Sequence, residues 1–254
     1  MKKIGYPRDY FEPKYECSKC KDTGFVSINN TNQYCNCFRQ KLVNYEYNQN
    51  NLLKLEDENF KTFDSGFFSK EVNKEKYKSD KSPYDNIMQI KKIAESFCEN
   101  MGKNEQKSLM FVGPTGTGKT FISNAIAKEV INKGYSVIYQ TAPILMDMLI
   151  NSKFKSLKDG NSKEQYDKVF DVDLLIIDDL GTETLSNTKF TELFNIINTR
   201  LLKDKKTIIS TNLNLNELAS FYDERVISRI IGNYIICRFF GDDVRLKAKK
   251  TSKS

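Results

Sequence analysis

Histidine is missing from the 254 residues of this chain. Its absence excludes imidazole as a general acid or base, and it excludes metal sites that mix histidine with cysteine. No apolar run approaches the ~18 residues that a membrane-spanning helix needs. The first eight residues carry two lysines without the apolar core of a secretory signal. We therefore expect a cytoplasmic protein that does not enter a membrane.

The composition is that of a folded protein. Hydrophobic residues make up 39% and aromatic residues 12% of the chain, which is enough for a core. A chain of this length can hold one α/β domain and a small additional module, because domains commonly contain ~100–200 residues. The formal net charge of +7 permits an anionic partner such as nucleic acid, although lysine-rich surfaces also serve solubility alone.

Five short apolar runs predict the strands of a parallel sheet. Each run is nearly continuous rather than alternating, which favours strands that are buried on both faces. Helical patterns separate them, as in α/β folds. The runs occupy residues 108–112, 136–139, 174–177, 207–210 and 234–239. We expect one helix to follow Lys119 and end at Gly134, and another to begin after an N-cap at Ser186.

The stretch between the first predicted strand and the next helix matches the phosphate-binding pattern G-x-x-x-x-G-K-[ST]. It consists of Gly113, Pro114, Thr115, Gly116, Thr117, Gly118, Lys119 and Thr120. Glycines let backbone N–H groups point at phosphate oxygens, and the start of a helix adds a positive dipole end. Lys119 is then placed to reach the β- and γ-phosphates of ATP, and the Thr120 hydroxyl to ligate Mg²⁺. A glycine-rich turn could match by chance, but the flanking strand and helix favour the motif.

Polar side chains follow two of the predicted strands. Asp178 and Asp179 come directly after the run 174–177, and Asn212 lies two residues beyond the run 207–210. Asp178 suits the carboxylate on the Mg²⁺ side, and Asp179 suits a group that orients or deprotonates the attacking water. Asn212 is placed to bond the γ-phosphate or its water. The alternatives are an Asp-rich turn and an asparagine that caps the next turn.

Arg225 and Arg229 stand four residues apart, and therefore on one face of a predicted helix. They suit arginine fingers, which enter the ATP site of a neighbouring subunit and stabilise transition-state charge. The spacing alone favours a solvated face.

Four of the six cysteines form two close pairs near the N-terminus. Cys17 and Cys20 are separated by fourteen residues from Cys35 and Cys37. In a reducing compartment such spacing predicts a structural Zn²⁺ site with four thiolates and no open coordination position. Four unligated thiols are the alternative. The two other cysteines, Cys98 and Cys237, lie in apolar patterns and are predicted core residues.

The order of these motifs resembles that of a known family. The sequences Gly-Pro-Thr-Gly-Thr-Gly-Lys-Thr, Leu-Leu-Ile-Ile-Asp-Asp-Leu-Gly, Ile-Ser-Thr-Asn and Glu-Arg-Val-Ile-Ser-Arg-Ile are similar to those of bacterial helicase loaders of the DnaC/DnaI type. These loaders are AAA+ relatives of the DnaA initiator and of IstB-type transposition helpers. The resemblance spans about residues 85–250 and implies a three-layer AAA+ ATPase domain with a five-stranded parallel sheet.

The resemblance also implies roles for single residues. By it, Arg229 matches the arginine finger, Arg225 the accessory arginine and Asn212 the sensor asparagine. Arg245 matches the late sensor arginine, which touches nucleotide within its own subunit. Asp179 stands where many AAA+ proteins carry glutamate, and the shorter side chain is consistent with slow, partner-stimulated hydrolysis.

We expect three segments along the chain. Residues 1–59 would hold the zinc module and a helical segment for binding the helicase, residues 60–85 a connector, and residues 86–254 the ATPase domain with a short basic tail. The aromatic residues of the connector would dock on the following domain; they are Phe60, Phe63, Phe67 and Phe68.

The resemblance implies an ATP-dependent loader that binds the replicative DNA helicase, helps to place it on single-stranded DNA at the initiation of replication, and self-associates through its ATP sites. The stretch with Lys153, Phe154, Lys155 and Lys158 is a candidate DNA contact, with a solvated loop as the alternative. Two other functions remain open. One is an IstB-like transposition helper that acts on a transposase and duplex DNA, and the other is a nucleotide-gated adaptor with negligible turnover.

Overall fold

The computed structural model describes residues 12–28, 30–48, 52–103, 106–156, 162–184 and 186–246. In the central part of these residues, five parallel strands form one sheet in the order β4-β5-β6-β3-β7. Their bounds are β3 Ser108–Val112, β4 Val137–Thr141, β5 Leu174–Leu180, β6 Lys206–Thr211 and β7 Tyr234–Arg238. The predicted five-stranded parallel sheet is therefore confirmed.

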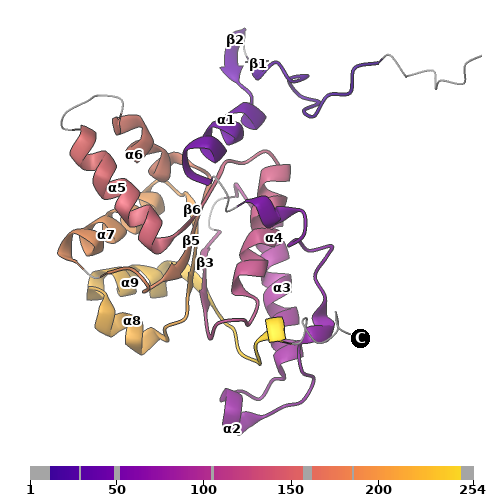
Figure 1. Ribbon diagram of the computed structural model, residues 1–254, viewed down its shortest axis with the longest axis vertical. Helices are drawn as coiled ribbons and strands as arrows, with labels where there is room; N and C mark the ends of the chain where they lie inside the picture. The colour runs from indigo at the N-terminus through magenta and orange to yellow at the C-terminus, as the bar shows by residue number, and fades with distance from the viewer. Residues whose placement is uncertain are drawn as a thin grey trace, which may run out of the picture.

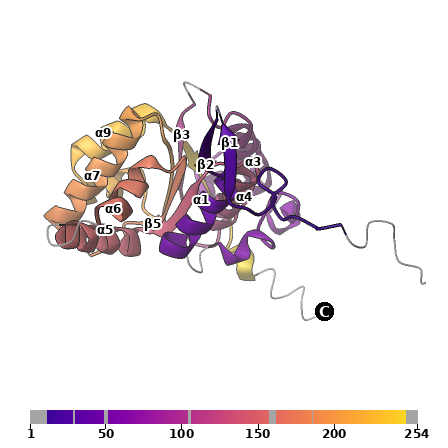
Figure 2. The same ribbon diagram turned by 90° about the horizontal axis from the view of Figure 1, so that it is seen from above.

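Helices cover both faces of the sheet and complete a three-layer α/β fold. Figure 1 shows α3 and α4 on one side and α5, α7 and α9 on the other, and Figure 2 shows the same layers from above. The helices are α1 Asn36–Val43, α2 Lys74–Tyr77, α3 Pro83–Glu99, α4 Lys119–Asn132, α5 Ala142–Ser156, α6 Ser162–Asp171, α7 Asn187–Leu202, α8 Leu215–Phe221 and α9 Glu224–Asn233. Among the described residues, no helix is both long enough and apolar enough to cross a membrane.

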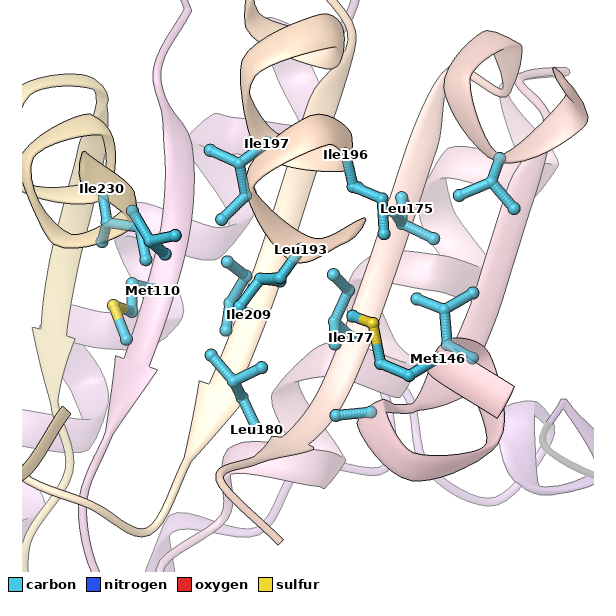
Figure 3. Packing of buried hydrophobic residues seen from close by; sticks show 14 of the residues in the cluster. Met110, Met146, Leu175, Ile177, Leu180, Leu193, Ile196, Ile197, Ile209 and Ile230 are labelled. Atoms are coloured by element: carbon cyan, nitrogen blue, oxygen red, sulfur yellow. The ribbon is translucent and has the colours of Figure 1, made fainter. Parts of the chain in front are cut away.

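The core lies in two clusters, one on each face of the sheet. Successive strand residues point to opposite faces, so Leu109 joins the α3–α4 cluster while Met110 joins the cluster under α5, α7 and α9. Figure 3 shows the second cluster, in which Leu193 and Ile197 of α7 lie over the strands. Each fully buried side chain of this kind stabilises the fold by roughly 1.5–3 kcal/mol.

The helix ends follow the sequence signals. The Ser186 side chain accepts a hydrogen bond from the backbone N–H of Lys189 and caps α7, as expected. Helix α4 ends at Asn132, and Gly134 adopts a left-handed φ of 87°, which glycine tolerates without strain.

The N-terminal part contains a small hairpin followed by a helical segment, and the helical segment lies against the edge of the sheet. Strands β1 (Phe25–Ile28) and β2 (Thr31–Tyr34) are antiparallel, and α1 continues into a π-helical turn, Asn44–Asn48. Two amide side chains from these helical segments bond the backbone of β4. Gln40 accepts from the Val137 N–H at 2.7 Å and donates to the Val137 carbonyl at 3.0 Å. Asn48 accepts from the Tyr139 N–H at 2.7 Å.

The next segment wraps the α3–α4 side of the domain. It includes 3₁₀ turns at Leu53–Leu55 and Ser65–Phe67, followed by α2. Its four phenylalanines pack against the α3–α4 cluster, and the Phe63 ring meets Phe121 edge-on at 5.7 Å between centroids. Helix α3 begins at Pro83, within the segment that we expected to be a connector.

Candidate nucleotide site and candidate metal centre

The phosphate-binding pattern forms the loop between β3 and α4. Three of its glycines have positive φ angles, 151° at Gly113, 75° at Gly116 and 99° at Gly118. At Gly113 an added Cβ would lie 2.1 Å from the carbonyl oxygen of Phe239, so the backbone passes too closely for a side chain. Helix α4 starts at Lys119 directly after this loop. The strand, loop and helix that the motif requires are therefore present.

Lys119 is buried beneath this loop, with 5% of its surface exposed. Its Nζ donates to the carbonyl oxygens of Gly113 at 2.6 Å and Pro114 at 2.8 Å, and to Oδ1 of Asn212 at 2.9 Å. Burial lowers the pKa of the ammonium group, while the nearby charges of Asp179 and Asp178 act in the opposite direction. Within the described residues, the cation thus bonds to neutral oxygens, although two acids lie close by.

Asp178 lies near the carboxyl end of β5, two residues before the strand ends, and is also 5% exposed. Its Oδ2 accepts from the Tyr139 hydroxyl at 2.8 Å and from the Thr120 hydroxyl at 3.2 Å. Its Oδ1 accepts from the Ser210 hydroxyl. The Thr120 hydroxyl and the Asp178 carboxylate therefore lie together at the start of α4. Oxygen ligands of this kind suit Mg²⁺, which is commonly held by one or two side chains and the substrate phosphates.

A β-bulge directs Asp179 toward the same place. Ile177 pairs with Ile209 but Leu180 pairs with Thr211, so Asp178 and Asp179 together oppose Ser210. Asp179 has a left-handed φ of 56°, and its Oδ1 lies 3.4 Å from Nδ2 of Asn212. Burial first, and then the charge of Asp178, raise the pKa of the Asp179 carboxyl group.

Arg245 lies at the nucleotide site as well. The backbone N–H of its neighbour Val244 donates to the carbonyl of Gly116 at 2.9 Å. The pKa of Lys119 is lowered mainly by burial, and the charge of Arg245 acts in the same direction. The Arg245 guanidinium donates to Asp243, through Nε at 2.9 Å and Nη2 at 2.6 Å.

The two arginines of α9 lie on the surface. Arg225 forms a two-pronged ion pair with Asp223 and stacks over the ring of Phe194 at 5.3 Å. Nε of Arg229 donates to Asn198 at 3.1 Å. Within the described residues, neither arginine forms a hydrogen bond or an ion pair with the phosphate-binding loop. In an isolated chain, both arginine side chains thus lie outside the candidate nucleotide site of that chain. An arginine that acts on the nucleotide site of a neighbouring subunit would be placed in this way.

The four N-terminal cysteines come together as a candidate metal centre. All four Sγ atoms lie within 4.8 Å of one another, with 3.8 Å between Cys17 and Cys35 and 3.4 Å between Cys20 and Cys37. A tetrahedral zinc site with Zn–S bonds of ~2.3 Å holds its sulfurs roughly 3.8 Å apart, so the donor set and spacing fit Zn²⁺.

The thiols also differ in acidity. The backbone N–H of Cys20 is the main cause that lowers the pKa of Cys17 to about 7, whereas burial raises the pKa of Cys37. The candidate metal centre contacts the α/β domain through Asn36, whose Nδ2 donates at 2.5 Å to the carbonyl of Gly134, just past the end of α4.

Some expected residues take other places. Lys153 pairs with the buried carboxylate of Glu192, so this lysine has a structural partner. The side chains of Phe154 and Lys155, and the whole of Lys158, fall outside the described residues. Cys98 and Cys237 are buried core residues, as expected, and burial raises the pKa of each thiol to about 12. The sequence interpretation missed Tyr139 and Ser210, which hold Asp178. Only their nearness to the ends of strands could have indicated them.

Comparisons with known proteins agree with this geometry. The sequence pattern of the family described as IstB-like ATP binding protein matches residues 74–252. The chain therefore belongs to the IstB-like ATP-binding family. It is 32% identical over 140 residues to the replicative helicase loader DnaC of Escherichia coli strain K12, a match that covers 54% of this chain and 56% of that protein. The match thus spans little more than half the length of this relative.

Solved structures share the fold of this family member. The crystal structure of the DnaC helicase loader matches with a TM-score of 0.57 and 25% identity over 74% of this chain and 99% of that one. The AMPPCP-bound DnaA of Aquifex aeolicus matches with a TM-score of 0.58 and 24% identity, over 77% of this chain and 54% of that one. The domain has the AAA+ fold.

Proposed function

We propose that this protein is a slow, partner-stimulated ATPase that loads the replicative DNA helicase onto single-stranded DNA when replication begins. The observation that carries the proposal is the meeting of Lys119, Thr120, Asp178 and Asn212 at the carboxyl ends of three strands. This is the edge at which α/β sheets bind their ligands. The similarity to proteins named replicative helicase loader supports the use of ATP for assembly rather than for metabolism.

Each residue of the site has a proposed task. The loop and the start of α4 would hold the phosphates, Lys119 would exchange its neutral acceptors for phosphate oxygens, and Thr120 with Asp178 would hold Mg²⁺. Asp179 and Asn212 would orient the attacking water. Bound Mg²⁺ would neutralise charge on the phosphates. Arg229, assisted by Arg225, would complete the site of a neighbouring subunit, which requires self-association.

We propose that the four cysteines hold a structural Zn²⁺ ion and that the surrounding module binds the helicase. The hairpin supports this, because its side chains are largely exposed and its described residues provide few buried apolar groups of their own. Phe25 and Tyr34, for example, are each 50% exposed. A module of this kind depends on its metal for folding. We place these events in the cytoplasm, where the helicase and DNA are found.

The decisive experiment is co-purification of the full-length chain with the replicative helicase of the same cell. Wild type, Lys119→Ala and Cys20→Ser would be compared, with zinc content measured for each. We expect the helicase to co-purify with wild type and to be lost with Cys20→Ser, which would also lose about one equivalent of zinc. If the wild-type chain captures no helicase but captures a transposase, the IstB-like transposition role replaces the loader role.

Turnover separates the loader from a nucleotide-gated adaptor. Phosphate release would be measured with and without single-stranded DNA, for wild type and for Lys119→Ala. Stimulation by DNA that depends on Lys119 supports an ATPase. Binding of ATP without any release of phosphate under either condition would instead indicate an adaptor.

A further inference from the structure

The segment 241–246, here called the C-terminal hook, lies against the phosphate-binding loop. Its backbone is fixed there by the bond from the Val244 N–H to the Gly116 carbonyl, and the Val244 side chain packs against the α3–α4 cluster. A Cβ built on Gly116 would lie 2.1 Å from both Cγ and Oδ1 of Asp243. The carboxylate of Asp243 therefore touches the loop at a residue where only glycine leaves room for it.

The same carboxylate holds Arg245. Nε lies 2.9 Å from Oδ1 and 3.2 Å from Oδ2 of Asp243, and Nη2 lies 2.6 Å from Oδ2. The backbone N–H of Arg245 also donates to Oδ1, at 3.0 Å. Arg245 thus has a charged acceptor, unlike Lys119, whose three acceptors are neutral oxygens. The Arg245 side chain is 61% exposed, so solvent screens the ion pair, while its two-pronged geometry fixes the orientation of the guanidinium group.

Contacts with α2, outside the candidate nucleotide site, also hold the hook in place. Nζ of Lys76 in α2 lies 2.6 Å from Oδ1 of Asp242, and the ring of Tyr77 stacks on Phe240 at 5.5 Å. These contacts do not involve Asp243. Replacement of the Asp243 carboxylate by an amide should therefore leave the hook in its place.

We propose that Asp243 is a positioning residue that restrains ATP binding: it holds Arg245 and places a negative charge beside the loop that receives the phosphates. Arg245 must leave Asp243 before it can bond a phosphate, so the strength of this ion pair sets how readily the site closes on ATP. Charge repulsion between the carboxylate and the polyphosphate acts in the same direction. This inference rests on the proposed nucleotide site.

The test is a titration of the full-length protein with a fluorescent ATP analogue, mant-ATP, and with mant-ADP, both in the presence of Mg²⁺. Asp243→Asn should bind mant-ATP several-fold to about tenfold more tightly than wild type, with a smaller gain for mant-ADP because it carries less charge. Asp243→Glu retains the charge and should stay within about twofold of wild type. Arg245→Ala should bind more weakly, and adding Asp243→Asn to it should recover only the part of the gain that loss of charge repulsion explains.

The outcomes separate the possible errors. Weaker or unchanged binding by a folded Asp243→Asn variant, with circular dichroism and Tm as the control, overturns the proposal. A double variant that keeps the full gain overturns the holding of Arg245, because repulsion alone would then explain the effect. Lys119→Ala provides the reference for the site itself. If wild type binds mant-ATP no better than Lys119→Ala, the nucleotide site is wrong, which is a different result from failure at Asp243.

Discussion

Lys119 and Arg200 are buried cations that lie at opposite ends of the sheet, in different surroundings. Lys119 sits at the carboxyl ends of the strands, with 5% of its surface exposed. Arg200 of α7 is fully buried near the amino end of β6. Its Nη1 donates to the carbonyls of Val169 and Val172 at 2.7 and 3.0 Å, its Nη2 to the carbonyl of Lys206 at 2.6 Å, and its Nε to Thr207 at 3.0 Å.

The comparison shows that burial and satisfied hydrogen bonds do not by themselves mark a functional cation. Both side chains donate to neutral oxygens. Burial lowers the pKa of both, to about 10 for Arg200. The difference lies in the surroundings. Lys119 belongs to a loop with left-handed glycines and lies near two carboxylates, whereas Arg200 joins the end of α6 to the start of β6 through backbone acceptors. The surroundings of Lys119 suit the binding of an anion, whereas Arg200 is enclosed by protein and donates to four protein oxygens.

The largest expected effect on stability is at Arg200. Arg200→Leu should lower the free energy of unfolding by about 3–5 kcal/mol, because it leaves buried carbonyls without donors. Urea denaturation measures this loss. The matched control is Lys203→Leu at the end of the same helix, because Lys203 is exposed and pairs at the surface with Asp171. We expect this control to change stability by no more than about 0.5 kcal/mol. Equal stability of Arg200→Leu and wild type would show that Arg200 is not structural.

Lys119→Ala should lower ATP affinity strongly and stability only slightly, in contrast to the large loss of stability expected for Arg200→Leu. We expect the free energy of unfolding to change by less than about 1 kcal/mol, because the three acceptors of Nζ lie at an open site edge that water can reach. ATP affinity should fall about 100-fold, since a charge-assisted contact to phosphate contributes roughly 1.5–3 kcal/mol. Urea denaturation and mant-ATP titration on the same sample give both values. A large loss of stability would make Lys119 resemble Arg200, and the contrast between the two ends would disappear.

Asp179→Asn should produce a smaller effect that depends on pH. The pKa of Asp179 is raised in the folded protein, mainly by burial. Below the ordinary pKa of an aspartate, the carboxyl group is protonated in both the folded and the unfolded chain, and the protein keeps its full stability. As the pH rises through the raised pKa of the folded protein, the buried carboxyl group must ionise and this stability is lost. The variant should therefore gain about 2 °C in Tm relative to wild type at pH 7.5 and little at pH 4. Thermal unfolding between these pH values measures the difference, and a gain that grows on acidification would contradict it.

The smallest expected effect on stability is at Arg229, which is exposed. Arg229→Ala should change the free energy of unfolding by less than about 0.5 kcal/mol and yet lower ATP hydrolysis by about a thousandfold. Mixing Arg229→Ala with Lys119→Ala should restore part of the activity, because each variant supplies what the other lacks. No recovery on mixing, with both variants folded, would show that Arg229 does not act on a neighbouring subunit.

Much of the fold could be predicted from short-range patterns. The run 108–112 coincides with β3, and the other four strands differ from their predicted bounds by one to three residues at an end. Apolar continuity identifies strands buried on both faces, and parallel strands bring their carboxyl ends to one edge. For this reason Asp178, Asp179 and Asn212 could be expected near Lys119.

The remaining features depend on contacts between distant residues, which a local pattern does not contain. The bulge that turns Asp179 becomes visible only in the pairing of β5 with β6. Arg200 has the sequence signature of an ordinary basic residue in the last turn of a helix. Asp243 reaches Gly116 across more than a hundred residues of chain, and no spacing rule indicates that contact.

The amide side chains of Gln40 and Asn48 have a consequence for the behaviour of the protein in solution. Strand β4 is an edge of the sheet, and an open edge can recruit a strand from another molecule and begin aggregation. These two side chains already bond the N–H and carbonyl of Val137 and the N–H of Tyr139. The N-terminal segment thus protects this edge from pairing with a strand of another molecule. Its displacement would make the chain prone to form insoluble β-rich assemblies.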